Sequence, residues 1–436
     1  MAPSLLYASC LKASANIGGF LLLCKFFKKK MLNFIPANLT NTTTMLTKIL
    51  NGRILTNQGV QNNCAIFFCD GKILEITDKN VELPSDPNTP SEVIDAKGAY
   101  VIPGGIELHA HGGGGRDFME GDEEAFRTAV NTHLRYGTTA IFPTLSASSK
   151  EMILEAAATT ERLMAEDNSP IMGLHLEGPY FNLDMAGAQI PEYVRIPEKT
   201  EYASILEHTS CIKRWDAAPE LPNAMDFARY ITSQGVMAAV GHTAADFDTI
   251  TAARDAGYSH ATHLYNAMTG VHKRGENKCE GTIESLLYYD DISVELIADG
   301  IHVPPAILRY VHKIKGTERM CLITDALAVM AADNASAFDP RVIIEDGVCK
   351  LKDRSALAGS IATMDRLIRT AVTQAEIPFA DVVRMTSETP ARIMGIYDRK
   401  GSLERGKDAD IVLLDSSMEV CGVWSMGKLV EGTLRL

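Results

Sequence analysis

The sequence lacks a cysteine framework and an excess of positive charge. Its nine cysteines are scattered over 436 residues, and no two of them form a Cys-x-x-Cys pair. This spacing is typical of reduced thiols in a cytoplasmic protein and argues against a disulfide-stabilised fold. The formal net charge is −13 at pH 7. Such a chain is not expected to bind nucleic acid non-specifically, although a local basic site can still hold a small anion.

The first 44 residues differ in composition from the rest of the chain. They include the apolar stretch SLLYASCLKASANIGGFLLLCKFFKKK, in which the basic cluster follows the apolar part. A secretory signal carries its positive charge first, so this order does not fit one. A membrane-spanning helix in this stretch would be short, and the glycines at 18 and 19 would interrupt it. We expect residues 1–44 to be a disordered or over-extended start outside the fold, with a membrane anchor as the alternative. No other membrane contact is expected.

Short strands and tight turns are predicted at both ends of the remaining chain. Residues 45–103 contain AIFFCDGKILEI, in which Asp70-Gly71 between two β-rich runs is a strong hairpin signal. Residues 395–436 contain ADIVLLD and a further β-rich run with a turn at Gly427-Lys428. We predict that the two segments pair into one small β domain.

Residues 104–394 alternate between strand-like and helix-like segments. Apolar runs such as TAIFPT and VMAAVGH are separated by segments such as EEAFRTAVNTHLRYG and DFDTITAARDAG. Repeated βα units of this length predict a parallel sheet. Roughly eight strands over about 290 residues fit a (β/α)8 barrel. A doubly wound sheet is the alternative, which is disfavoured because no Gly-x-Gly-x-x-Gly motif follows a first strand.

Two histidines end the first predicted barrel strand. His109 and His111 close the run VIPGGIELHAH, and residues two apart on a strand point to the same side. The four glycines that follow allow the backbone to come close to whatever lies there, which would leave room for a metal ion and its water. Taken alone, the pair is equally compatible with a polar strand end that holds no metal.

Further metal-competent or proton-transferring groups end other predicted strands. These are Glu177 in GLHLEG, His242 in AAVGH, His263 in HATHLYN and Asp325 in LITDA. A (β/α)8 barrel gathers such strand ends at one mouth. Histidines and carboxylates suit a divalent ion such as zinc, which polarises a carbonyl while a nearby carboxylate moves a proton. Each residue alone could be structural, but the joint pattern favours metal-assisted hydrolysis.

Longer motifs between Met45 and Leu436 make a family resemblance specific. They are PGGIELHAHG, HLEGPYF, VGHTAAD, THLYNAMTG, ADGIHV, LITDA, LAGSIATMDR and GSLERGKDADIVLLD, in this order. On these motifs the chain resembles the amidohydrolase superfamily, and within it the N-acetylglucosamine-6-phosphate deacetylases. The resemblance implies a metal-bearing (β/α)8 barrel beside a small β-sandwich built from both chain ends. It also implies a cytoplasmic homodimer that releases acetate from a sugar phosphate in amino-sugar catabolism.

The resemblance implies a metal site and a catalytic residue. Glu177, His242 and His263 match the primary ligands, and Asp325 matches the catalytic general acid and base. Some members of the family lack the first-strand histidines, whereas His109 and His111 are both present here. One or two divalent ions are therefore expected per subunit, with Glu177 as the bridge, and zinc is favoured over iron, cobalt or manganese. No lysine ends MGLHLEG, so a carbamylated-lysine bridge is not expected.

The resemblance also implies a substrate-binding set. His302 and Arg274 match phosphate contacts, and in the family the arginine reaches across from the partner subunit. The loop HKRGENKCEG departs from the usual His-Arg-Glu-Pro-Gly, so His272, Lys273 or a solvated loop without a substrate role are alternatives. The other matched positions are Ala188, Gln189, Asn266, Ala267, Asp299, Leu357, Ala358, Gly359 and Ser360. For residues 357–360 the alternative is a plain turn in which Ser360 caps the next helix.

Other functions are also compatible with the metal-competent residues of this sequence. Another metal-dependent amidohydrolase, acting on a cyclic amide or a dipeptide, would keep the metal residues but would not need Arg274 and His302. A non-catalytic amidohydrolase-like scaffold is disfavoured because no ligand is missing, and a sugar-phosphate-binding regulator is disfavoured by Asp325. The sequence does not separate N-acetylglucosamine from related N-acetyl hexosamine phosphates.

Overall fold

The computed structural model describes residues 45–82, 90–333 and 337–436. The expectation for residues 1–44 lies outside these described residues. Across the described ranges, no helix combines the length and the apolar character needed to cross a membrane.

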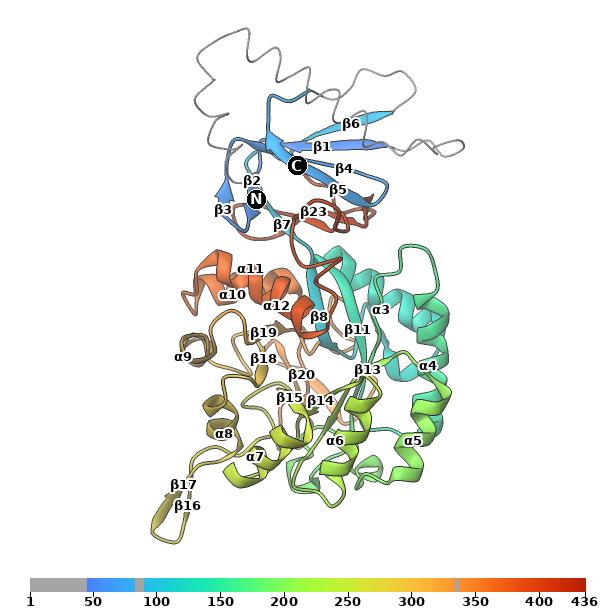
Figure 1. Cartoon of the computed structure of the whole chain (residues 1–436), viewed down its shortest axis with the longest axis vertical. Helices are drawn as coiled ribbons and strands as arrows, with labels where there is room; N and C mark the ends of the chain where they lie inside the picture. Colours follow the sequence, from blue (N-terminus) through green and yellow to red (C-terminus); the bar gives the residue numbers. More distant parts are fainter. Residues whose placement is uncertain (1–44, 83–89, 334–336) are drawn as a thin grey trace, which may run out of the picture.

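An eight-stranded parallel sheet forms the centre of the larger part of the molecule (Figure 1). Its strands are β8 (Gly105–Ala110), β11 (Thr138–Leu145), β12 (Leu174–Tyr180), β13 (Ile212–Ala217), β14 (Met237–Val240), β15 (Tyr258–Ala261), β18 (Ser293–Ile297) and β19 (Met320–Ile323). Each strand pairs with the next one in this order. A parallel bridge between Ala110 and Ala326 then joins the last strand to the first. The predicted parallel sheet is confirmed, and its sequential, closed order excludes the doubly wound alternative.

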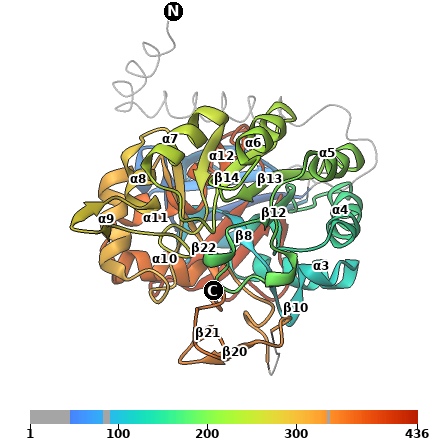
Figure 2. The ribbon, with the colours of Figure 1, turned by 90° about the horizontal axis from the view of Figure 1, so that it is seen from below.

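Helices surround this barrel (Figure 2). They are α3 (Glu123–Arg135), α4 (Lys150–Met164), α5 (Lys199–His208), α6 (Ala224–Ser233), α7 (Phe247–Ala256), α8 (Thr282–Tyr288), α9 (Pro305–Lys315), α10 (Met364–Thr373), α11 (Phe379–Thr386) and α12 (Glu388–Ile393). The side chains of Asp122, Ser149 and Asp246 cap α3, α4 and α7 by accepting a backbone N–H of the first turn. Because helices cover the outside, every residue of β11 and β12 is buried.

Both ends of the described chain contribute to two further sheets. The first sheet has the order β5-β4-β1-β6, and the second has the order β24-β23-β22-β7-β2-β3. Their strands are β1 (Leu46–Leu50), β2 (Arg53–Thr56), β3 (Gly59–Gln61), β4 (Cys64–Cys69), β5 (Lys72–Asp78), β6 (Ser91–Asp95), β7 (Tyr100–Pro103), β22 (Ile411–Leu414), β23 (Val420–Ser425) and β24 (Lys428–Leu429). β7 pairs with β22, so segments far apart in the sequence share a sheet. Phe68 from the first sheet and Trp424 from the second belong to one buried apolar cluster.

Among the described residues, three small antiparallel pairs of strands lie in the loops of the barrel. They are β9 (Gly112–Gly113) with β10 (Arg116–Asp117), β16 (His272–Arg274) with β17 (Asn277–Cys279), and β20 (Val342–Glu345) with β21 (Val348–Leu351). Short 3-10 helices lie at η1 (Phe118–Glu120), η2 (Leu183–Met185) and η3 (Pro191–Tyr193). The β16–β17 hairpin protrudes from the barrel (Figure 1).

Candidate active site

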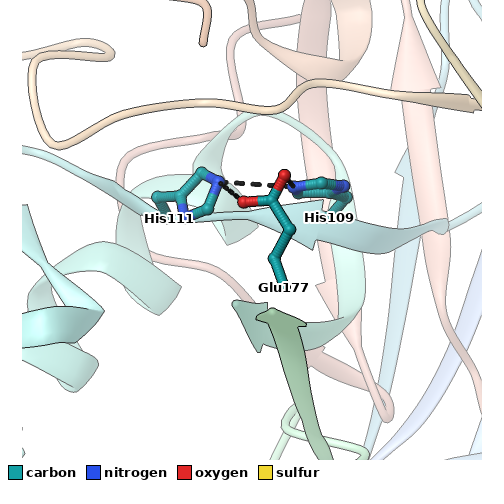
Figure 3. Close-up of side chains that lie close together, drawn as sticks. All are labelled: His109, His111 and Glu177. Atoms are coloured by element: carbon teal, nitrogen blue, oxygen red, sulfur yellow. Dashed lines mark hydrogen bonds and ion pairs between the residues drawn. The ribbon is translucent and has the colours of Figure 1, made fainter. Parts of the chain in front are cut away.

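Four imidazoles and one carboxylate converge at the carboxyl ends of the barrel strands. Glu177 lies at the centre, with its Oε1 3.0 Å from the Nε2 atoms of both His242 and His263. Its other oxygen, Oε2, lies 3.4 Å from Nε2 of His111, and Oε1 lies 3.7 Å from Nε2 of His109 (Figure 3). None of the five side chains belongs to a residue more than 5% exposed. Five residues from the ends of four strands, β8, β12, β14 and β15, therefore meet at one buried point.

Two overlapping groups of these residues could hold a metal ion. Their potential ligand atoms, in His109, His111 and Glu177 and in Glu177, His242 and His263, lie within 4.8 Å of one another. The Nε2 atoms of His242 and His263 are 3.1 Å apart, and those of His109 and His111 are 3.3 Å apart. Two imidazole lone pairs at such distances repel each other unless a proton or a cation lies between them. The nitrogen and oxygen donors fit a divalent ion of the zinc type.

The outer nitrogens of the imidazoles explain why Nε2 faces the centre. His109 Nδ1 lies 2.8 Å from Glu295 Oε1, His111 Nδ1 lies 3.2 Å from Ser146 Oγ, and His242 Nδ1 lies 2.9 Å from the carbonyl oxygen of Met185. A carbonyl oxygen only accepts, so His242 donates from Nδ1 and directs the lone pair of Nε2 inward. Metal-ligating histidines are commonly oriented in this way. His263 differs, because its buried Nδ1 has no hydrogen-bond partner among the residues that the structure describes.

Asp325 follows β19 and lies beside the first histidine pair. Its Oδ1 is 3.2 Å from Nε2 of His111 and 3.5 Å from Nε2 of His109. Burial alone would raise the pKa of this carboxyl group, but the adjacent imidazoles outweigh it and hold the pKa of Asp325 below its usual range. A carboxylate in this position is able to accept a proton from a water in the same pocket.

The backbone is strained at three of the strand ends. His242, His263 and Asp325 all have positive φ angles, of 48°, 28° and 48°. Non-glycine residues rarely adopt this conformation, which costs on the order of 1–3 kcal/mol each. Such strain is retained where the surrounding structure requires one side-chain direction. Here that direction is toward Glu177 or toward the His109–His111 pair.

The first glycine after His111 allows two segments of the chain to pack closely. A Cβ on Gly112 would lie 2.3 Å from the carbonyl oxygen of Arg116 and 3.0 Å from the backbone of Ala328. At Gly112 the missing side chain therefore allows a close approach between segments of this chain. His111 itself lies one residue beyond the end of β8.

The cluster lies in a cavity of about 290 Å³ that also contains much of the predicted substrate-binding set. Besides His111, Glu177, His242, His263 and Asp325, the predicted residues that line it are Ala188, Gln189, Asn266, Ala267, His302, Leu357, Ala358 and Gly359. Sequence reasoning missed other lining residues, including Asp117, Met119, Ser146, Phe338 and Asp339. The last two precede β20, and no apolar periodicity marks that segment as part of a pocket.

Three residues of the predicted set do not line this cavity. Asp299 lies behind His302, because its Oδ2 is 2.8 Å from Nδ1 of His302. Ser360 is fully buried and donates to the carbonyl oxygen of Thr324. It does not cap α10, for which Thr363 is the N-cap residue. Arg274 lies on the exposed β16 strand, together with His272 and Lys273.

A buried charge network that sequence reasoning also missed lies beneath the site. Arg214 on β13 is hydrogen-bonded to Asp216 at 2.9 Å and to Glu295 at 2.5 Å. Glu295 in turn backs His109, and Asp216 lies 2.9 Å from His175. Burial and the charge of Arg214 lower the pKa of His175 to about 4, which keeps this imidazole neutral. The signal was present in KRWDA and SVELI, where charged residues interrupt otherwise apolar strands.

Comparison with known proteins agrees with this geometry. The amidohydrolase family model matches residues 100–430, and the chain belongs to that family. Within it, the chain is 32% identical over 375 residues to the N-acetylglucosamine-6-phosphate deacetylase of Bacillus subtilis (strain 168), which covers 84% of this chain and 92% of the relative. It is 31% identical over 395 residues to the N-acetylgalactosamine-6-phosphate deacetylase of Escherichia coli O157:H7, covering 88% of this chain and 100% of the relative.

A solved structure is similar over the same range. It is a variant of the Mycobacterium smegmatis N-acetyl-D-glucosamine-6-phosphate deacetylase in complex with N-acetyl-D-glucosamine-6-phosphate. The match has a TM-score of 0.79 at 29% identity and covers 89% of this chain and 100% of the other. The family resemblance inferred from the sequence motifs is thereby confirmed.

Proposed function

We propose that this protein is a metal-dependent deacetylase that converts N-acetylglucosamine 6-phosphate into glucosamine 6-phosphate and acetate in amino-sugar catabolism. The observation that carries the proposal is the placement of Asp325 beside two ligand groups that share Glu177 in one pocket. The Bacillus subtilis relative and the Mycobacterium smegmatis structure bear the name of this activity.

The proposed cofactor is one or two divalent ions per subunit, with zinc favoured over iron, cobalt and manganese. Glu177, His242 and His263 would hold the primary ion, and His109 and His111 would hold the second together with Glu177. When bound, such an ion polarises a carbonyl oxygen and makes a water molecule more acidic.

Asp325 performs the proton transfers in the proposed reaction. It takes a proton from the water that attacks the acetyl carbonyl carbon, so that a new C–O bond forms. It then gives the proton to the sugar nitrogen as the C–N bond breaks, which releases acetate and the free amine. Asn266 and Ala267 are proposed to hold the sugar, and residues 357–359 to enclose the acetyl group.

The phosphate is proposed to lie at the His302 side of the pocket. Nδ1 of His302 is engaged by Asp299, whereas its buried Nε2 has no partner within the described residues. In the cationic form of the imidazole, that nitrogen can donate to a phosphate oxygen. Arg274 is proposed to supply the opposing cation from the partner subunit of a cytoplasmic homodimer.

Exposed apolar side chains support such a dimer. Val271 at the β16–β17 hairpin is 58% exposed, and Tyr288 on α8 and Tyr310 on α9 are 68% and 52% exposed. α8 and α9 contact each other, so these residues belong to neighbouring elements.

We also propose that residues 45–103 and 395–436 form a β-sandwich domain distinct from the barrel of residues 104–394.

N-acetylgalactosamine 6-phosphate is a second candidate substrate. The relative from Escherichia coli O157:H7 bears that name at nearly the same identity as the Bacillus subtilis enzyme. The two sugars differ only in the configuration at C4, so the same metal and phosphate contacts would serve both.

A substrate panel tests the proposal. Acetate release is measured from both N-acetyl hexosamine 6-phosphates and from unphosphorylated N-acetylglucosamine. Hydrolysis of a cyclic amide and a dipeptide is measured in parallel, with metal content determined on the same sample. We expect phosphorylation to raise kcat/KM by about 100-fold or more, the value of two charge-assisted hydrogen bonds of about 1.5 kcal/mol each. Equal turnover of the unphosphorylated sugar, or faster turnover of the cyclic amide or dipeptide, would contradict it.

A further inference from the structure

The hydrogen bonds of Gln189 indicate a role that differs from sugar binding. Gln189 lies between η2 and η3, and it is only 7% exposed. Both ends of its side-chain amide are engaged. Oε1 accepts the backbone N–H of Ala147 at 2.7 Å, and Nε2 donates to Oε2 of Glu177 at 2.6 Å.

These two contacts determine the orientation of the amide. The backbone N–H of Ala147 can only donate, so the oxygen of Gln189 must face it. The carboxylate of Glu177 can only accept, so the NH₂ group must face Glu177. A flipped amide would place donor against donor at one end and acceptor against acceptor at the other.

The amide of Gln189 in turn restricts Glu177. The terminal torsion of a glutamate is soft, so the plane of a free carboxylate rotates easily. With Nε2 of Gln189 bound to Oε2, the other oxygen faces His242 and His263 at 3.0 Å. Oε2 meanwhile stays 3.4 Å from Nε2 of His111. Oε1 thus faces His242 and His263, whereas Oε2 faces His111.

The loop that carries Gln189 is itself braced. Nη2 of Arg341 donates to the carbonyl oxygens of Ala188 at 2.8 Å and of Gln189 at 3.3 Å. Asp339 holds the same guanidinium through its Oδ2 at 2.6 Å. The contacts of Arg341 hold the backbone of Gln189 in place, and the N–H of Ala147 holds its side-chain oxygen.

We propose that Gln189 is a positioning residue that orients the carboxylate of Glu177 for metal binding and contributes little to sugar binding. The proposal rests on the proposed function, in which Glu177 is the shared ligand. Hydrogen-bond partners of a metal ligand typically change metal affinity by about 10- to 100-fold when they are removed.

The test replaces Gln189 with a side chain of similar length that cannot hydrogen-bond. For Gln189→Met, zinc affinity is measured by competition with a chelator, and kcat and KM for N-acetylglucosamine 6-phosphate are measured at saturating zinc. We expect zinc to bind about 10- to 100-fold more weakly. KM at saturating zinc should stay within about 2-fold, because no direct contact with the sugar is lost.

Two further variants provide the comparison. His302→Asn changes a pocket residue that does not contact Glu177, and it should raise KM while zinc affinity stays unchanged. Arg341→Met loosens the loop without removing an atom next to Glu177, and it should weaken zinc binding less than Gln189→Met. If Gln189→Met does not fold, Gln189→Asn replaces it. The shorter amide cannot span both contacts, so its zinc affinity should also fall below that of the wild type.

The possible failures are distinguishable. If Gln189→Met raises KM as His302→Asn does and leaves zinc affinity unchanged, Gln189 is a sugar contact and the inference is wrong, while the proposed function stands. If Glu177→Ala also leaves zinc affinity unchanged, Glu177 is not a ligand. In that case the proposed function fails together with the inference.

Discussion

Asp325 combines a strained backbone with a carboxylate close to two imidazoles. Its φ angle is 48°, a conformation that aspartate and asparagine tolerate better than most residues. Asp325→Asn should therefore preserve the backbone while removing the proton acceptor. We expect kcat to fall by about 10²- to 10⁴-fold, with zinc content and KM retained. Steady-state kinetics on zinc-loaded protein measures this, and a near-normal kcat would remove Asp325 from the mechanism.

His109 and His111 are proposed to hold a second metal ion, so they determine whether a subunit binds one ion or two. Their imidazoles and Glu177 form a ligand group separate from the one that contains His242 and His263. The double variant His109→Gln with His111→Asn should lower the bound metal from about two ions per subunit to about one. Activity should fall but persist, because the primary ligand group is intact.

Metal analysis of carefully loaded protein measures this change. His133→Gln is the control, because His133 is a buried imidazole that contacts only the carbonyl oxygen of Gly112 through Nε2 among its described hydrogen bonds. It should leave the metal content unchanged. One ion in the wild type, unaffected by the double substitution, would show that the pair merely fills the barrel mouth.

Residue spacing predicted the positions of the metal-competent residues but not the side chains that hydrogen-bond to them. The two-residue spacing of His109 and His111 places both on one side of a strand, which is local information. Gln189 reaches Glu177 only because a long loop folds back over the barrel mouth and Arg341 holds it there. No local pattern encodes that contact, so sequence reasoning did not predict it.

At the scale of elements, the inner face of the barrel carries charges that compensate one another. Arg214 is fully buried and contacts two buried carboxylates, Asp216 and Glu295. Arg214→Met would leave both carboxylates without their cation. We expect a loss of about 3–5 kcal/mol in the free energy of unfolding, as is usual when one partner of a buried ion pair is removed.

Urea denaturation measures this loss, with Arg229→Met as the control. Arg229 also pairs with an aspartate, but its side chain is 60% exposed on α6. Exposed pairs contribute about 0–1 kcal/mol, so the control should remain close to the wild type. Equal effects of the two substitutions would mean that the buried network is not needed for stability.

The alternation of elements was predictable where apolar periodicity was strong. The runs TAIFPT and RMCLITDA became β11 and β19, because buried parallel strands are continuous apolar segments. The hairpins β16–β17 and β20–β21 were not predicted. β16 and β17 are largely exposed and β20 is mostly half-buried, so little burial distinguishes these strands from loops. β21 is largely buried, but it is only four residues long.

At the scale of the whole molecule, the pairing of distant segments was predictable only in outline. Two β-rich ends suggested a shared domain, and β7 does pair with β22. The register, in which Ile411 lies opposite Pro103, depends on side chains from both sheets packing around Trp424. Such packing is not encoded in either segment alone.

The proposed homodimer makes a prediction about subunit mixing. Arg274 is exposed and does not line the pocket of its own subunit. If it serves the partner's pocket, Arg274→Ala should lower kcat/KM by about 10- to 100-fold, the value of a charge-assisted hydrogen bond of about 1.5–3 kcal/mol. A dimer of one Arg274→Ala subunit and one Asp325→Asn subunit would then contain one intact site. That site would take Asp325 from the first subunit and Arg274 from the second.

Co-expression of the two variants therefore distinguishes a trans role from a cis role. With equal amounts and random pairing, half of the dimers are mixed and each has one intact site of two, so activity should reach about a quarter of the wild-type value. The separately expressed variants, mixed without subunit exchange, are the control and should show only the sum of their residual activities. If co-expression gives no more than this sum, Arg274 does not act across a dimer interface. The phosphate would then have to be bound by residues of the same subunit, with His302 as the first candidate.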